Sequence, residues 1–369
     1  MPVVKRNATG VSTAVVIALT SITATSGDLG CGSARDNASS DAGADAAPVA
    51  QGCLPFHSQS NIAALSGAPR SNANDSLWWF DSAKVGDATI ANPGLVTGDP
   101  GKRCAFTGTP AQSIADPSRL GPTATMSLLD AFMTPAQLGL FAYYAAYEPA
   151  SDQPFGVRAI GFGIAKRDTN GAFPGVFRPT SGAVIWTGDR PSYGNAVGMS
   201  TDGAFIYVYG CKSAGPLAHD CYVARARFDG DLTSATAYYY DADGTWTPNA
   251  DEARPVARAG PVVSVKWHGE LSRWVMTYVP TLGRDIRMRT AQYFEGPWSD
   301  ETTLASCDLA GADPDAFCTG GQQHPDLPVT YGHSVVVSYG IASLKPDLTL
   351  PPDAYWPRLV ELDLPTQAP

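Results

Sequence analysis

An aromatic-rich strand pattern recurs five times at nearly even spacing, and this repeat constrains the fold more than any other feature. The segments begin at positions 77, 140, 205, 274 and 335, which are 63, 65, 69 and 61 residues apart. A fixed period of this kind is typical of architectures assembled from one supersecondary unit. We therefore expect five similar structural units along the chain.

The clearest unit lies within residues 260–299. Trp274, Met276 and Tyr278 alternate with smaller residues, a period of two that predicts a strand with one buried face. A glycine-containing turn follows, and residues 286–291 resume the alternation. This pattern predicts a β-meander.

Most of the other units share this second half. Strand-like segments follow the aromatic strands at 157–167, 221–228 and 358–364. About 64 residues per unit leaves room for four strands and long loops. We predict an all-β, five-bladed β-propeller over residues 53–369, in which radial repetition leaves only short strand edges. A two-sheet sandwich is the less favoured alternative.

The net charge of the chain argues against nucleic-acid binding. The net charge of −10 and the pI near 4.9 are opposite to the basic surface that nucleic-acid binding requires, so no nucleic-acid partner is expected.

The first thirty residues predict an export signal. Lys5 and Arg6 precede an apolar run at 11–20, and Cys31 follows a zone of small residues. The segment resembles a bacterial lipoprotein signal in which Cys31 is lipidated, although Asp28 replaces the leucine usual there. The run is shorter than the roughly 18 residues of a membrane-spanning helix. We expect an outer-membrane or cell-surface lipoprotein, or otherwise a secreted protein.

Residues 31–52 are rich in Ala, Asp and Ser, and a segment of this composition predicts a disordered tether. Six cysteines remain beyond Cys31, an even number that suits disulfides in an exported chain. Close spacing favours two loop-closing pairs and leaves a third, although fifteen connectivities are possible. None has CxxC spacing, so no metal site is predicted. The two loop-closing disulfide pairs are Cys211/Cys221 and Cys307/Cys318, and the third pair is Cys53/Cys104.

Candidate chemistry is limited to isolated carboxylates. The chain lacks the GxSxG, HExxH, phosphate-loop and dinucleotide motifs. Glycoside cleavage needs two facing carboxyl groups, roughly 5 to 9.5 Å apart. The acids beside repeat strands are Asp81, Glu148, Asp202, Asp285, Glu295 and Asp326.

Several motifs resemble one protein family. WVMTY, RMRTA and EGPWS in the fourth unit, with QHPDL and VVVSYG in the fifth, are similar to secreted bacterial five-bladed propellers catalogued mainly as a domain of unknown function. The resemblance covers about residues 60–364. It implies a relation to endo-D-arabinanases, and an architecture similar to arabinanase, levansucrase and invertase propellers.

The resemblance also implies two acids in the first blade. The segment 77–82 is similar to one of the two motifs and keeps Asp81 as a candidate catalytic residue, without the preceding glycine. Ser66 stands where the other acid is expected, and Asp75 is the nearest downstream carboxylate. A serine is no carboxylate base at neutral pH without an activating partner. This departure favours a noncatalytic propeller.

Three further residues are candidates for ligand binding: Trp79, His324 and Asp326. Each also has a structural interpretation, because aromatic residues in repeat strands fill cores and loop histidines form local hydrogen bonds. Asp81 can likewise be a turn acid that binds backbone amides.

Other polar residues near the repeats have structural interpretations. Asp202 and Glu295 each precede a glycine and are expected in turns. The arginines expected in charge ladders between blades are Arg158, Arg225, Arg287 and Arg289.

These observations predict a cell-surface propeller that engages carbohydrate, and they favour a noncatalytic glycan- or protein-binding lipoprotein. The alternative is a glycoside hydrolase acting on arabinan-like or fructan-like polysaccharide. No cofactor is expected, and a cation on the axis stays open. The expected partner is a polysaccharide or surface glycan, with membrane contact only through the lipid.

Overall fold

The computed structural model describes residues 63–65, 76–85, 88–98, 112–113, 125–133, 139–150, 153–166, 178–188, 190–200, 202–228, 237–309, 312, 314–325, 327, 329–343 and 358–365. Side chains are described for residues 129–132 and 141–146, and from Ile185 onwards. The described residues form strands, with one short 3-10 helix, η2 (Ala250–Glu252). The all-β prediction is therefore confirmed.

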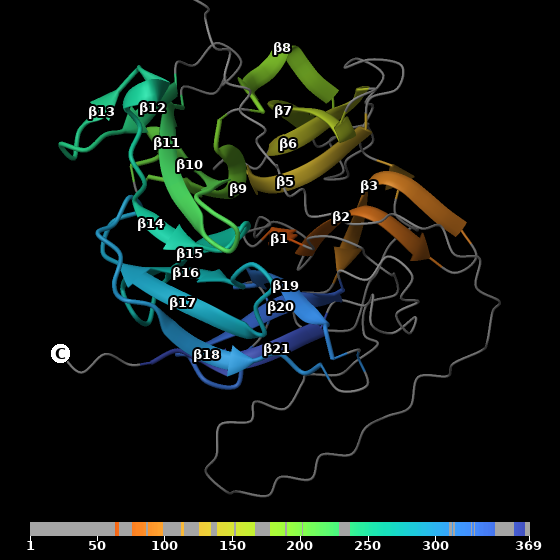
Figure 1. The fold of residues 1–369 in the computed structure, drawn as a ribbon, viewed down its shortest axis with the longest axis vertical. Coiled ribbons are helices and arrows are strands. Elements are labelled where there is room, and N and C mark those ends of the chain that lie inside the picture. The colour runs from red at the N-terminus through yellow and green to blue at the C-terminus, as the bar shows by residue number, and fades with distance from the viewer. Residues whose placement is uncertain are drawn as a thin grey trace, which may run out of the picture.

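The strands form five antiparallel sheets (Figure 1). The first sheet contains β1 (Ala63–Leu65), β2 (Ser76–Val85), β3 (Ala88–Gly98) and β4 (Gln112–Ser113). The second contains β5 (Thr125–Met133), β6 (Gly139–Ala150), β7 (Gln153–Lys166) and β8 (Arg178–Thr187). The third contains β9 (Ser192–Met199), β10 (Phe205–Ser213), β11 (His219–Arg227), β12 (Ala237–Tyr240), β13 (Trp246–Thr247) and β14 (Ala257–Ala259). The fourth contains β15 (Val263–His268), β16 (Arg273–Tyr278), β17 (Asp285–Ala291) and β18 (Thr302–Ser306). The fifth contains β19 (Phe317–Gln323), β20 (Ser334–Ala342) and β21 (Arg358–Asp363).

The sheets are arranged as in a β-propeller, with the first strand of each on the inside. β1 contacts β5 and β19, β9 contacts β5 and β15, and β15 contacts β19. Figure 1 shows β1 near the centre of the view, with the sheets around it. The inner strands of neighbouring sheets therefore lie next to each other.

The predicted repeat corresponds to one position in every sheet. The segments at 77, 140, 205, 274 and 335 lie in β2, β6, β10, β16 and β20, each the second strand of its sheet. The segments predicted to follow them lie in β7, β11, β17 and β21, each the third strand. Even spacing in the sequence therefore reflects a repeated meander.

The prediction that the strand at 274–278 buries one face is wrong, because both of its faces are buried. Met276 and Tyr278 pack with residues of the third sheet, including Tyr209. Val275 packs with residues of the fifth sheet, including Val335. A sheet that lies between two others has no solvent face, so its second strand is apolar on both sides.

Two of the predicted disulfides are present. Cys211 pairs with Cys221, which lies opposite it on the neighbouring strand, and Cys307 pairs with Cys318. Such bonds are typical of oxidising, exported compartments. Cys53 and Cys104 lie outside the described residues, as do the expected signal (1–30), with its lipidation site Cys31, and the tether (31–52). Within the described part of the chain, no helix is long and apolar enough to cross a membrane.

Candidate functional site

Asp130 is the one buried carboxylate among residues with described side chains, with an exposed fraction of 4%. Its Oδ1 accepts a hydrogen bond from the Ala131 amide at 2.9 Å. Its Oδ2 accepts from the Val197 amide at 2.8 Å and from Lys266 Nζ at 2.9 Å. Asp130 thus connects the inner strands β5, β9 and β15.

Local irregularities of the inner strands place these polar groups. The pairing of β5 with β6 shifts between Leu128 and Ala131, so Asp130 lies in a β-bulge. The pairing of β9 with β10 shifts in the same way and leaves Gly194 and Asn195 in a bulge. A bulge bends the strand and changes the direction of its side chains, so a polar side chain can point away from the apolar face of the sheet.

Lys266 is the cation that pairs with Asp130. Its side chain is 20% exposed, whereas that of Asp130 is 5% exposed. Burial, and secondarily the positive charge of Lys266, lower the pKa of His324 to about 3. His324 is therefore neutral at physiological pH, and its Nε2 lies 2.7 Å from Ser338 Oγ. We refer to Asp130, Lys266 and His324 as the inner-strand cluster.

Gln323 fixes the end of β19 beside this cluster. Its amide Nε2 donates to the Ser264 and Val275 carbonyl oxygens at 3.0 and 2.9 Å. Its backbone amide donates to Ser264 Oγ at 3.1 Å. These bonds hold the fifth sheet against the fourth and fix the position of His324, the next residue in the chain.

The predicted site residues fall partly outside the described region. Asp81 lies at a shift in the pairing of β2 with β3, so its backbone forms a bulge as that of Asp130 does, but its side chain is not described. Trp79 lies opposite Ala63 on β1, and its side chain is not described either. Asp326 lies outside the described residues. His324 is fully buried beside Ser338, and its role in ligand binding stays a prediction.

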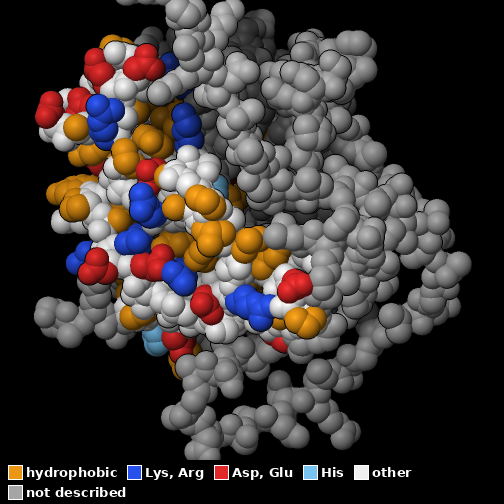
Figure 2. All heavy atoms as spheres, in the orientation of Figure 1, with side chains coloured by type: hydrophobic (Ala, Val, Ile, Leu, Met, Phe, Trp, Pro, Cys, Tyr) orange, Lys and Arg blue, Asp and Glu red, His pale blue; other side chains and the backbone are white. Residues whose placement is uncertain are grey.

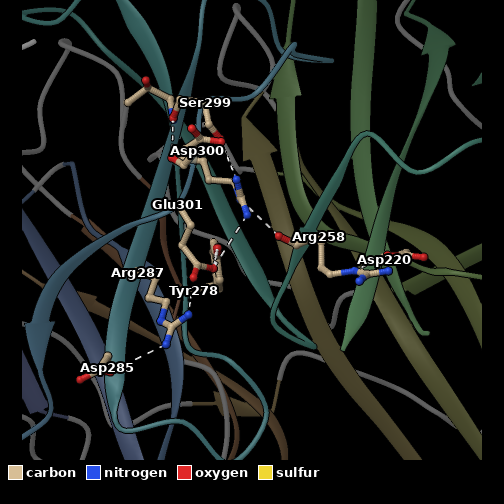
Figure 3. Close-up of polar contacts among 10 residues, drawn as sticks. Asp220, Arg258, Tyr278, Asp285, Arg287, Ser299, Asp300 and Glu301 are labelled. Atoms are coloured by element: carbon tan, nitrogen blue, oxygen red, sulfur yellow. Dashed lines mark hydrogen bonds and ion pairs between the residues drawn. The ribbon is translucent and has the colours of Figure 1, made fainter. Parts of the chain in front are cut away.

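A second polar group lies on the fourth sheet (Figure 3). Glu301 forms an ion pair with Arg287, accepts a hydrogen bond from the Tyr278 hydroxyl, and lies 3.9 Å from Arg289. Burial, and then the bond to Glu301, raise the pKa of Tyr278. Arg289 also donates to the Arg258 carbonyl oxygen, which belongs to the third sheet. Arg289 therefore connects neighbouring sheets through a backbone carbonyl, whereas the ion pairs of Arg287 and Arg289 stay within the fourth sheet.

Asp202, one of the predicted turn residues, has a structural role. Asp202 accepts from Ser200 Oγ at 2.5 Å and from the Ala204 amide at 3.0 Å, which closes the turn between β9 and β10. These bonds lower the pKa of Asp202.

Asp130 and Lys266 were not predicted from the sequence. The available signal was a carboxylate within the apolar run 126–133, because an unpaired carboxylate is costly to bury. Within the described residues, no three His, Cys, Asp or Glu side chains gather as potential metal ligands.

Comparison with known proteins finds a family match over part of the chain and solved structures of similar fold. Residues 164–337 match the model of DUF4185, a domain of unknown function. A comparison with curated protein sequences finds no match. A Bacteroides ovatus protein provisionally assigned as a hydrolase is similar in structure, with a TM-score of 0.59 and 17% identity, over 84% of this chain and 86% of that one.

Two further solved structures have lower scores. The GH43_1 enzyme of Xanthomonas citri in complex with xylose has a TM-score of 0.49 and 14% identity, over 86% of this chain and 90% of that one. The RS223 β-xylosidase has a TM-score of 0.48 and 11% identity, over 86% of this chain and 95% of that one.

Proposed function

We propose that this protein is an exported five-bladed β-propeller that cleaves glycosidic bonds in an arabinan-like or fructan-like polysaccharide. The observation that carries the proposal is the likeness in fold, over most of both chains, to the hydrolase-like protein of Bacteroides ovatus. The buried carboxylate of Asp130 on an inner strand adds a charged group where the sheets meet. This proposal replaces the noncatalytic function that the sequence favoured.

The catalytic step needs two carboxyl groups, and the strands that carry Asp81 and Asp130 contact each other. Three N–H donors surround Asp130, so this carboxylate is arranged to hold negative charge. Negative charge near the scissile bond stabilises the oxocarbenium-like transition state. Asp81, at the bulge of β2, then serves as the general base or nucleophile, and a carboxylic acid from another blade donates the proton that the leaving sugar oxygen takes.

A noncatalytic glycan-binding function is the second candidate. The observation that favours it is Ser66, which stands where the resemblance implies an acid. Measuring glycan binding and glycan cleavage in parallel separates the two functions. Binding without cleavage by the folded protein, on every arabinan and fructan tested, favours the second candidate.

Cleavage itself is tested with Asp81→Asn. Removing an essential carboxylate leaves at most a small residual rate, commonly lower by a hundredfold or more. Ser66→Ala is the matched control, because it changes a first-blade residue that has no carboxylate to lose. Equal rates for Asp81→Asn and the unchanged protein would remove Asp81 from the mechanism.

We also propose that Cys31 carries a lipid that anchors the protein to the membrane. The signal-like segment before it supports this assignment. Labelled palmitate should enter the protein and be lost in Cys31→Ser. Persistent labelling of that variant would contradict the anchor.

A further inference from the structure

Arg225 on β11 has an unusual environment for a charged residue. Its guanidinium carbon lies 4.5 Å from the centre of the Phe205 ring and 4.2 Å from the centre of the Trp246 ring. Contacts of this kind with two rings fix the plane of the guanidinium and restrict its movement. Arg225 is therefore held in place by aromatic side chains.

No carboxylate neutralises this cation within the described residues. Its Nε is buried and has no hydrogen-bond partner, and no ion pair or hydrogen bond of Arg225 occurs in the part of the chain that the structure describes. Arg287, by contrast, forms an ion pair with Glu301. Among the described residues Arg225 has no charged partner, so its place in a charge ladder stays a prediction. A fixed guanidinium with no ion-pair partner among the described residues presents a planar set of donors that matches a carboxylate.

Aromatic side chains extend from this cation toward the fourth sheet. Trp246 contacts Tyr207 at 5.7 Å between ring centres, and Tyr207 contacts Phe294 at 5.2 Å. Phe294 contacts Trp274 at 4.8 Å, and Trp274 contacts Trp267 at 5.6 Å.

Trp267, at the end of this row, is 48% exposed, which is high for a side chain of its size. Figure 2 shows hydrophobic side chains interspersed with charged ones of both signs on one face of the molecule. The row thus combines a fixed cation with a solvent-facing indole.

We propose that Arg225, with this aromatic row, binds a carboxylate-bearing polysaccharide, one that contains uronic acid residues. The guanidinium pairs with the sugar carboxylate, and the exposed indole packs against the apolar face of a sugar ring. The inference rests on the proposed carbohydrate function and adds an acidic substrate class to it. The site lies on the third strand of the third sheet, whereas the inner-strand cluster lies on or directly after first strands.

The test measures binding of polygalacturonate to the purified full chain by titration calorimetry, with the fully methyl-esterified polymer as the matched neutral ligand. The unchanged protein should bind the acidic polymer at least tenfold more tightly than its ester. Arg225→Gln should weaken binding of the acidic polymer about tenfold to a hundredfold, because a charge-assisted pair is lost.

Arg227→Gln is the matched control, since Arg227 is exposed on the same strand and loses the same charge. The dissociation constant of this control for polygalacturonate should lie within twofold of that of the unchanged protein. Arg225→Lys keeps the charge but loses the planar donors, and it should bind several-fold more weakly. Arg225→Met keeps the aliphatic stem, and its melting temperature shows whether lost binding reflects lost folding.

Four results would overturn the proposal: equal binding of both polymers, unchanged binding in Arg225→Gln, an equal loss in Arg227→Gln, or stronger binding of polyphosphate than of polygalacturonate. The last would indicate a phosphate polymer instead. Cleavage of neutral arabinans is measured on the same samples. Intact cleavage without uronate binding contradicts this inference alone, whereas absent cleavage with uronate binding contradicts only the proposed hydrolase.

Discussion

The ion pair between Lys266 and Asp130 should respond unequally to removal of its two members. Lys266→Met leaves the Asp130 carboxylate, 5% exposed, without its cation. An uncompensated buried charge destabilises a fold by about 3 to 5 kcal/mol. Asp130→Asn leaves the Lys266 ammonium, whose side chain is 20% exposed and can turn towards water. That change removes one acceptor and should cost about 1 to 3 kcal/mol.

The free energy of unfolding is measured by urea denaturation with the disulfides intact. We expect Lys266→Met to be less stable than Asp130→Asn by about 2 kcal/mol. The double variant Lys266→Met/Asp130→Leu should recover part of the loss, because no charge then stays buried. Equal losses, or a larger loss in Asp130→Asn, would refute the reasoning from burial.

Three further predictions concern stability. The pKa of His324 is about 3 in the fold against an ordinary value of 6.5, so the unfolded chain binds the extra proton first as the pH falls. The free energy of unfolding should therefore fall by up to about 1.4 kcal/mol per pH unit as the pH drops from 6.5 towards 3. In urea denaturation at a series of pH values, His324→Gln should reduce this slope. Changing Cys307 and Cys318 together to serine opens a loop of sequence separation 11 and should cost about 2 to 4 kcal/mol by urea denaturation; a loss below 1 kcal/mol would contradict this. Gly194→Ala should lower the melting temperature by several degrees, because Gly194 has φ +106° and an added Cβ would lie 2.7 Å from the Tyr143 Cβ. An unchanged melting temperature would be inconsistent with this close contact.

The second and third strands of each sheet could be predicted because they repeat at even intervals. Aromatic and β-branched residues in β10, β16 and β20 produce a strong signal, and burial on both faces keeps most of their central residues apolar. The inner strands were harder to predict. β9 reads SYGNAVGM and β19 reads FCTGGQQ, and their glycines and amides interrupt the alternation. Those interruptions coincide with the bulges.

The candidate site could be predicted only in part, because its parts lie far apart in the chain. Asp130 and Lys266 are 136 residues apart in sequence, and no local pattern predicts their ion pair. Cysteines differ in this respect. Cys211 and Cys221 are ten residues apart, and so short a spacing favours their pairing among the fifteen possible connectivities.

The most direct test of the account is the release of reducing ends from arabinans and fructans by the purified protein, beside its Asp81→Asn and Ser66→Ala variants. The account predicts release by the unchanged protein and by Ser66→Ala, and a loss of about a hundredfold in Asp81→Asn. No release from any of these polysaccharides by a protein with an intact melting transition would contradict the proposed glycoside hydrolase.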